Sequence, residues 1–198
     1  MQVIMKKYVY LIRHGTTAAN QQNCLYGHSD VPLARAGIAQ VKALANLGAY
    51  PNPANAAFYT SGLLRTEQTL ALIYGEVTHV KLDSLKEIAF GAYEMKTHDS
   101  LKNDPVYAAW AKDESGLLAP PGGESLRQFS ERVKHGLQTI LSAGEEHSVV
   151  VCHGGVVGVM MMSYFDDYSN NIYQWIPAPG HGYTVIFDGS FPSRYEAF

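Results

Sequence analysis

An arginine and a histidine stand side by side at the end of an apolar run near the start of the chain. Residues 8–12 have the character of a buried strand, and Arg13, His14 and Gly15 follow them directly. In an open α/β sheet, ligands bind at the carboxyl ends of the strands, where this turn would lie. A guanidinium group suits an anion such as a phosphate or a carboxylate, and an imidazole beside it can act as a nucleophile or a base.

The same succession of strand, turn and helix recurs twice along the chain. Residues 149–152 are an apolar run that ends in His153, Gly154 and Gly155, and an apolar helical stretch follows. Residues 57–60 are a third run, which turns at 61–62 and opens a helix with Arg65 in its first turn. One such turn is weak evidence, because glycines also serve ordinary tight turns. Charged side chains are rarely buried without partners, so we expect the three turns to converge on one anionic ligand.

Five motifs follow one another along the chain. They are Arg13-His14-Gly15 with Thr17 and Asn20, the segment 61–69 around Arg65, Glu87 with Phe90-Gly91, the segment 121–125, and His153-Gly154-Gly155. In this order they resemble the histidine phosphatase superfamily, and most of all the branch that contains phosphoglycerate mutases and α-ribazole phosphatases. The resemblance extends from residue 7 to about residue 187, which is nearly the whole chain.

The resemblance and the chemistry of the side chains imply a role for each residue. His14 would attack phosphorus to form a phosphohistidine, and Glu87, with a raised pKa, would protonate the leaving group. His153, if protonated, would be a third positive donor. The residues expected to bind the phosphate are Arg13, Asn20, Arg65 and Gly154. Those expected to line the substrate pocket are Thr17, Tyr26, Gly27 and Tyr93.

Length and composition favour a single globular domain over residues 1–198. The chain is 46% hydrophobic and 17% charged, with a net charge of only −3, so no overall field favours nucleic acid or a membrane. Two cysteines, Cys24 and Cys152, make no disulfide framework, and we expect a cytoplasmic protein without a signal peptide. The expected partner is a small phosphorylated metabolite, and the chain would be a monomer or a homodimer.

Alternating strands and helices predict a three-layer α/β/α sandwich with a largely parallel central sheet. Helices are expected over residues 34–47 and 124–141, and a late strand over 184–187. The resemblance adds that the sheet is mixed, with an antiparallel edge, as in phosphoglycerate mutases. Residues 92–121 mix aromatic and charged side chains, which predicts either a helical insertion over the site or a solvated surface excursion.

Two other functions fit part of the pattern. His14, His153 and Glu87 could form a two-histidine, one-carboxylate zinc site of a metallohydrolase, but two arginines in the same pocket would repel a dication. A phospholigand-binding module without turnover is the other alternative, although it would have no need of a nucleophile and an acid. We therefore expect no metal and no cofactor.

Two observations bear on the choice between phosphatase and mutase. By resemblance, mutases hold the substrate carboxylate with a pair of arginines and a lysine in the insertion, but residues 91–123 contain no arginine. Gly155 stands where the mutases usually carry asparagine. These two observations favour a phosphatase. Met95 stands where the family usually has a glycine, so the shape of the acid loop, and with it the choice of leaving group, is open.

Overall fold

A six-stranded sheet forms the centre of the protein. The computed structural model describes residues 6–165, 171–189 and 191–198. In these ranges the sheet has the order β4-β3-β6-β1-β7-β8. Its parallel strands are β1 (Lys6–Arg13), β3 (Ala57–Thr60), β4 (Val80–Lys81) and β6 (His147–Cys152). Its antiparallel edge consists of β7 (Gly182–Asp188) and β8 (Phe191–Ala197). The prediction of a largely parallel sheet with an antiparallel edge is confirmed.

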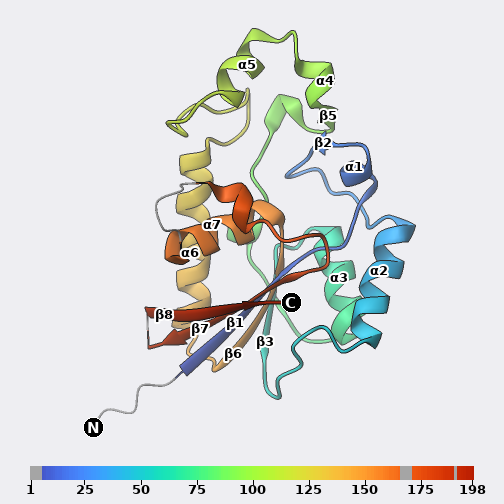
Figure 1. Ribbon diagram of the computed structural model, residues 1–198, viewed down its shortest axis with the longest axis vertical. Coiled ribbons are helices and arrows are strands. Elements are labelled where there is room, and N and C mark those ends of the chain that lie inside the picture. Colours follow the sequence, from blue (N-terminus) through green and yellow to red (C-terminus); the bar gives the residue numbers. More distant parts are fainter. Residues whose placement is uncertain (1–5, 166–170, 190) are drawn as a thin grey trace.

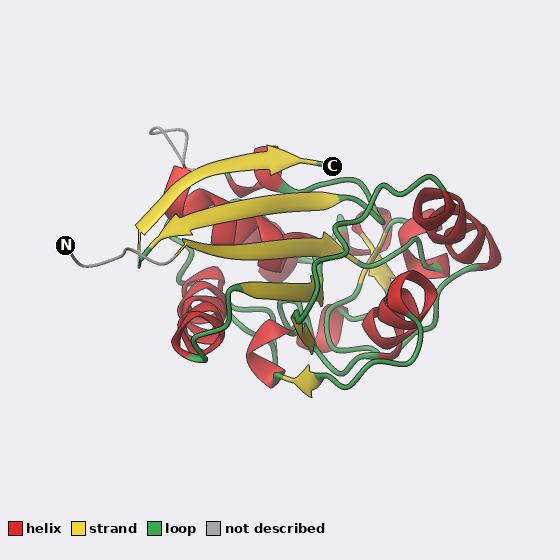
Figure 2. Ribbon diagram, turned by 90° about the horizontal axis from the view of Figure 1, so that it is seen from below, coloured by secondary structure: helices red, strands yellow, loops and turns green. Residues whose placement is uncertain are grey.

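Helices cover both faces of this sheet (Figure 1). One face carries α2 (Arg35–Asn46) and α3 (Leu64–Tyr74), and the other carries α6 (Leu126–Ser142) and α7 (Gly154–Phe165). Side chains alternate along β1, so Leu11 belongs to the core against α6 and α7 while Ile12 belongs to the core against α2 and α3. A strand that is buried on both faces reads as one continuous apolar run, which is why these strands were visible in the sequence. Figure 2 shows the strands side by side in one curved sheet.

The predicted helices are present, with small differences at their ends. The helix expected over 34–47 begins at Arg35, after Ala34, and ends at Asn46. The helix expected over 124–141 runs from Leu126 to Ser142, because the side chain of Ser125 caps its first turn. The late strand is longer than expected, and β8 was not predicted. Most of β8 is exposed at the edge of the sheet, so it lacks the apolar alternation that marks a buried strand.

A smaller group of elements lies beyond the carboxyl ends of the parallel strands, at the top of Figure 1. Short strands β2 (Cys24–Leu25) and β5 (Lys96–Thr97) pair there, next to α1 (Ala18–Gln21). Two helices follow, α4 (His98–Leu101) and α5 (Pro105–Ala111). They share a small core whose members are Leu25, Tyr93, Leu101 and Tyr107. The remaining elements are the 3-10 turns Asp83–Leu85, Gly91–Tyr93 and Ile172–Trp175.

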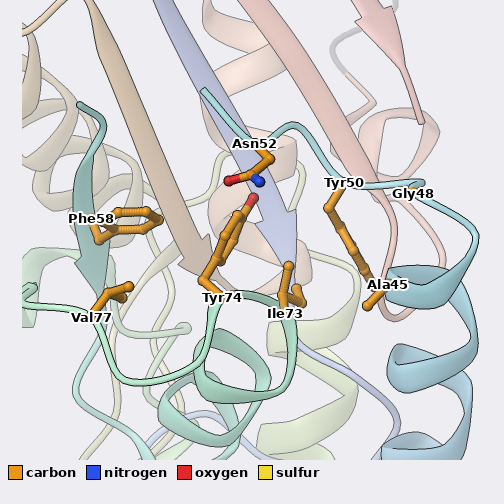
Figure 3. A pocket seen from close by; sticks show the side chains of 8 residues that line it. All are labelled: Ala45, Gly48, Tyr50, Asn52, Phe58, Ile73, Tyr74 and Val77. Atoms are coloured by element: carbon orange, nitrogen blue, oxygen red, sulfur yellow. The ribbon is translucent and has the colours of Figure 1, made fainter. Parts of the chain in front are cut away.

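One cavity, of about 300 Å³, lies away from the carboxyl ends of the strands (Figure 3). It is bounded by the ends of α2 and α3 and by the connection that leads into β3, with Tyr50 and Tyr74 on its walls. None of the predicted site residues lines it. None of the helices in the described ranges is long and apolar enough to cross a membrane.

Candidate active site

The three predicted turns meet at the carboxyl ends of the parallel strands β1, β3 and β6. Arg13, the last residue of β1, lies beside Cys152, the last residue of β6, and Thr60 of β3 lies on the far side of that strand, beside Val151. The backbone N–H of His14 donates to the carbonyl of Cys152 at 3.0 Å. This places the rings of His14 and His153 with their centroids 5.2 Å apart, so both can contact one small ligand.

His14 is buried as a neutral imidazole. Its Nδ1 lies 2.7 Å from the carbonyl oxygen of Gly15, and because a carbonyl can only accept, Nδ1 carries the proton and donates. Burial and, after it, the nearby charge of Arg65 lower the pKa of His14 to about 3. At neutral pH Nε2 therefore has a free lone pair, which is the form that a nucleophile requires.

Arg65 lies in the first turn of α3, as the sequence predicted, and it is completely buried. Nη1 and Nη2 donate to the carbonyls of Ser29 and Gly27, at 2.8 and 2.6 Å. The guanidinium also stacks over the ring of Tyr26, 4.9 Å from its centroid. The loop 26–29 thus fixes the orientation of the Arg65 guanidinium.

His153 is also neutral in this structure. Its Nδ1 accepts a hydrogen bond from Nε of Arg65 at 3.2 Å, and a guanidinium can only donate. The proton is therefore on Nε2, which donates to the hydroxyl of Ser61 at 2.8 Å. Burial and, after it, the charge of Arg65 hold the pKa of His153 well below its ordinary value. From the sequence we expected His153, if protonated, to be a third positive donor. In this structure His153 is neutral, and the neighbouring positive charge is that of Arg65.

Arg13 presents a donor that the fold itself does not satisfy. Its Nη1 donates to the carbonyl of Pro177 at 2.8 Å, whereas Nε is buried without a hydrogen-bond partner among the described residues. A buried donor of this kind calls for an acceptor, and an oxygen of an anionic ligand would serve. Gly154 makes room for this guanidinium, because a Cβ at that position would lie 3.1 Å from Nε.

Glu87 reaches the same site from the chain that follows β4. Oε2 accepts the backbone N–H of Gly155 at 2.8 Å, and Oε1 accepts the N–H of Ile88 at 3.0 Å. Burial raises the pKa of Glu87, and the two hydrogen bonds and the two arginines offset that effect only in part. The direction is the one that a proton donor near neutral pH needs.

Thr17, Asn20 and Tyr26 form a hydrogen-bonded group beside His14. Thr17 caps α1, and Oδ1 of Asn20 accepts the backbone N–H of Thr17 at 3.0 Å. The hydroxyl of Thr17 lies 2.9 Å from that of Tyr26, whose ring meets His14 edge-on. Since these bonds use the carbonyl of Asn20, its amide nitrogen is the group with which it would donate to a phosphate.

None of the four predicted pocket residues, Thr17, Tyr26, Gly27 and Tyr93, lines the large cavity described below. Gly27 contributes its carbonyl to Arg65, and it must be a glycine because a Cβ there would lie 1.7 Å from the carbonyl oxygen of Ile88. Tyr93 is buried behind Tyr107 and Trp110, with ring centroids 5.5 and 6.1 Å away, so it supports the wall.

Glu94 is a residue that sequence reasoning missed. Its carboxylate accepts the backbone N–H groups of Gly27, His28, Ser29 and Phe90, and the hydroxyl of Ser29. It thereby ties the loop that holds Arg65 to the loop that carries Glu87. The residue stands in the motif 90–95, but no spacing along the chain indicates that it binds a segment more than sixty residues away.

A cavity of about 540 Å³ opens beside Glu87 and Gly155, on the side away from the arginines. Its walls are largely apolar and aromatic. They come mainly from α5, from the segment between α5 and α6, from α6 itself, and from the 3-10 turn 172–175. The ring-bearing members are Phe90, His98, Tyr107, Trp110, Phe129 and Tyr173. The acidic members are Glu87 and Asp113, and no lysine or arginine of the described chain lines the cavity.

Metal ligands do not gather at this site in the described part of the chain. No three histidine, cysteine, aspartate or glutamate side chains within residues 6–165, 171–189 and 191–198 are placed to hold an ion. The cations that the described site presents to an anion are guanidinium groups.

Comparison with known proteins agrees with these motifs. A family model described as the histidine phosphatase superfamily, branch 1, matches residues 9–190. An adenosylcobalamin/α-ribazole phosphatase of Salmonella typhimurium is 30% identical over 158 residues, which are 77% of each chain. A 2,3-bisphosphoglycerate-dependent phosphoglycerate mutase of Xanthobacter autotrophicus is 30% identical over 167 residues, 79% of this chain and 80% of the other.

Solved structures show the same two kinds of relative. The α-ribazole phosphatase of Shigella flexneri superposes with a TM-score of 0.84 at 25% identity, over 94% of this chain and 93% of the other. A phosphoglycerate mutase of Thermus thermophilus gives 0.71 at 30% identity, over 96% and 99%. The predicted family and its phosphoglycerate mutase-like fold are confirmed, and this chain belongs to the histidine phosphatase superfamily.

Proposed function

We propose that the protein is a metal-independent phosphatase that hydrolyses a small phosphomonoester, with an apolar or aromatic leaving group, through a phosphohistidine on His14. The observation that carries the proposal is the cavity beside Glu87, whose described walls are aromatic and contain no cation. The α-ribazole phosphatases among the relatives make an ester of that kind the first candidate.

The first step transfers the phosphoryl group to the enzyme. Arg13 and Arg65 hold the phosphate oxygens, and the lone pair on Nε2 of His14 attacks phosphorus. The bond from phosphorus to the leaving oxygen breaks, and Glu87 gives its proton to that oxygen. The free alcohol remains in the cavity, and the enzyme holds a phosphohistidine and a glutamate carboxylate.

The second step returns the enzyme to its starting state. Once the alcohol has left, a water molecule takes its place beside Glu87, and the carboxylate removes a proton from this water. The oxygen attacks phosphorus, the bond between Nε2 and phosphorus breaks, and inorganic phosphate leaves. His14 is again neutral and Glu87 again protonated, so one ester and one water give one alcohol and one phosphate.

The cavity favours this reaction over a phosphoglycerate mutase. A phosphoglycerate carries a carboxylate, and a carboxylate taken out of water needs a cation or several donors. Among the described residues, the cavity walls offer no lysine or arginine, and the carboxylate of Asp113 would repel such a substrate. The mutase relatives keep that activity as the second candidate.

A substrate panel with the purified enzyme distinguishes the two functions. We expect kcat/KM for α-ribazole phosphate and for aryl phosphates to exceed that for 3-phosphoglycerate by about a hundredfold or more, which corresponds to about 2.7 kcal/mol for the unpaired carboxylate. Interconversion of the two phosphoglycerates, faster than hydrolysis of any ester in the panel, would show instead that the protein is a mutase.

Trapping the intermediate tests the role of His14. Rapid acid-free quenching with a ³²P-labelled ester is expected to give a base-stable, acid-labile phosphoenzyme, and His14→Ala is expected to give none. His135→Ala changes an exposed histidine on α6 and is the matched control, which should keep the label. Label retained by His14→Ala would exclude His14 as the nucleophile.

A further inference from the structure

Two adjacent glycines open α7, and each receives a different group of the site. Gly154 faces Ile176 and the guanidinium of Arg13, whereas Gly155 faces Glu87. A Cβ on Gly155 would lie 2.3 Å from Oε1, 3.1 Å from Cδ and 3.2 Å from Oε2 of Glu87. Carbon and oxygen do not approach so closely without a bond. A side chain at position 155 and the present position of the Glu87 carboxyl therefore exclude each other.

The backbone gives no other reason for a glycine at position 155. The residue is helical and is not among the glycines with positive φ, so any L-residue could adopt its conformation. In a helix, glycine is less favourable than every residue except proline. The close approach of Glu87 is thus the feature of the described structure that requires the missing side chain.

The contact with Gly155 also orients the carboxyl. The N–H of Gly155 donates to Oε2 at 2.8 Å and the N–H of Ile88 donates to Oε1 at 3.0 Å, so each oxygen has one fixed partner. Both Glu87 and Gly155 line the 540 Å³ cavity, whereas Arg13 and Arg65, whose charges act on Glu87, do not line it. The carboxyl is thereby held at the boundary between the cations and the cavity.

We propose that Gly155 is a positioning residue: its missing side chain and its N–H hold the Glu87 carboxyl where it can protonate a leaving group in the cavity. This inference rests on the function proposed above. A side chain at position 155 would move the acid away from that boundary while leaving His14, Arg13 and Arg65 in place. Such a change would make the enzyme selective for esters whose leaving group needs no proton.

The variant Gly155→Ala tests this through the dependence of the rate on the leaving group. The two probes are p-nitrophenyl phosphate, whose phenolate leaves unaided, and 2-phenylethyl phosphate, a similar ring on a poor alkoxide leaving group. We expect kcat/KM to fall by about 10² or more for the phenylethyl ester and by less than about tenfold for the nitrophenyl ester, because general acid catalysis contributes about 10² to 10⁴.

The neighbouring variant Gly154→Ala is the matched control. It adds the same methyl group to the same helical turn, but against Ile176 and Arg13 and not against Glu87, so its loss should be equal for the two esters, which carry similar rings. Combining Gly155→Ala with Glu87→Gln gives the second control. If position 155 acts only through the acid, the double variant should be no slower on the phenylethyl ester than Glu87→Gln alone.

Thermal unfolding keeps the test decisive if Gly155→Ala folds poorly. Shortening Glu87 to alanine removes the atoms with which the new methyl group would collide, so Gly155→Ala should lower Tm in the wild-type background but not in Glu87→Ala. Equal losses on both esters, additive losses with Glu87→Gln, or an equal drop in Tm in both backgrounds would each overturn the proposal. If Glu87→Gln itself shows no dependence on the leaving group, the proposed acid is wrong, which is a different failure.

Discussion

Glu94 offers a way to disturb the phosphate site without touching any residue that contacts the phosphate. Burial by itself raises the pKa of Glu94, but hydrogen bonds from Ser29, His28, Gly27 and Phe90 outweigh it and leave the pKa below its ordinary value. The carboxylate is therefore ionised in the fold and holds the loop whose carbonyls accept from Arg65. The informative substitution is Glu94→Gln, which keeps the shape and removes the charge.

The loss of stability in Glu94→Gln depends on the donors from which each carboxylate oxygen of Glu94 accepts a hydrogen bond. Oε1 accepts the N–H groups of Gly27, His28 and Phe90, and Oε2 accepts those of Gly27 and Ser29 and the hydroxyl of Ser29. A glutamine loses the fewest hydrogen bonds when its NH₂ group replaces Oε2. In that orientation the N–H of Ser29 is the one backbone donor that faces another donor, because the N–H of Gly27 still has Oε1. An unsatisfied buried donor costs about 1–3 kcal/mol, and the half-buried position of Glu94 puts the cost at about 1–2 kcal/mol.

Two measurements check this prediction. For a chain of this size, that cost lowers Tm by about 2–8 °C at pH 7. The displaced loop should also lower kcat/KM for p-nitrophenyl phosphate by about tenfold, which is about 1.4 kcal/mol of the contact between Arg65 and the phosphate. Because the folded pKa is depressed, the stabilisation is present above the ordinary glutamate pKa of about 4.3 and is lost below it, so the difference in Tm should shrink in acid.

The control for Glu94→Gln is the same exchange at Glu76, which is exposed after α3 and should change neither quantity. If Glu94→Gln leaves both Tm and kcat/KM at the values of Glu76→Gln, the carboxylate does not hold the loop that places Arg65. A lowered Tm with unchanged kcat/KM would show that Arg65 keeps its place without the loop.

Three further predictions concern stability and metal. Met95 has φ of +61° and is 44% exposed. Met95→Gly should relieve about 1–2 kcal/mol of left-handed strain, which the greater freedom of glycine in the unfolded chain offsets in part, so Tm should rise by about 1–4 °C. A lower Tm would show that the side chain of Met95 contributes more stability than the strain costs. The folded pKa of Glu87 is raised, so its ionisation destabilises the fold as pH rises above about 4.3, and the Tm of Glu87→Gln relative to the wild type should be higher at pH 7 than at pH 4; a Tm difference independent of pH would contradict this. Activity on p-nitrophenyl phosphate should survive extensive dialysis against EDTA, whereas a loss that zinc restores would support the metallohydrolase.

The sequence was sufficient for those parts of the site that are local. His14 and His153 each follow a strand buried on both faces, and Arg65 opens the helix after a third. Parallel neighbours end at the same edge of a sheet, so three such turns predict their own convergence. The family resemblance supplied Glu87, which no periodicity would have distinguished from a surface glutamate. Met95, where the family usually has a glycine, has a positive φ, a backbone conformation typical of glycine.

What the sequence could not indicate depends on contacts between distant segments. Glu94 meets residues 27–29, and Gly155 meets Glu87, across 65 residues or more. Nothing in the spacing of these residues encodes either approach, because each results from the packing of loops that the sheet brings together. Tyr93 is a similar case. Its type suggested a pocket wall, but the burial of its ring behind Tyr107 and Trp110 follows from how the segment folds on itself.

The same two charges prepare the site for both the anion and the nucleophile. Burial lowers the pKa of His14 first, and Arg65 and then Arg13 lower it further, so the cations that would bind the phosphate also keep Nε2 unprotonated. His153 is neutral for the same reasons, and burial favours the neutral form of Glu87. With that acid protonated, these five groups carry the two charges of Arg13 and Arg65, which balance a phosphomonoester dianion near neutral pH. A third cation would weaken this balance by drawing the proton from Glu87, so the neutrality of His153 in the resting site favours the proton transfer that the leaving group requires.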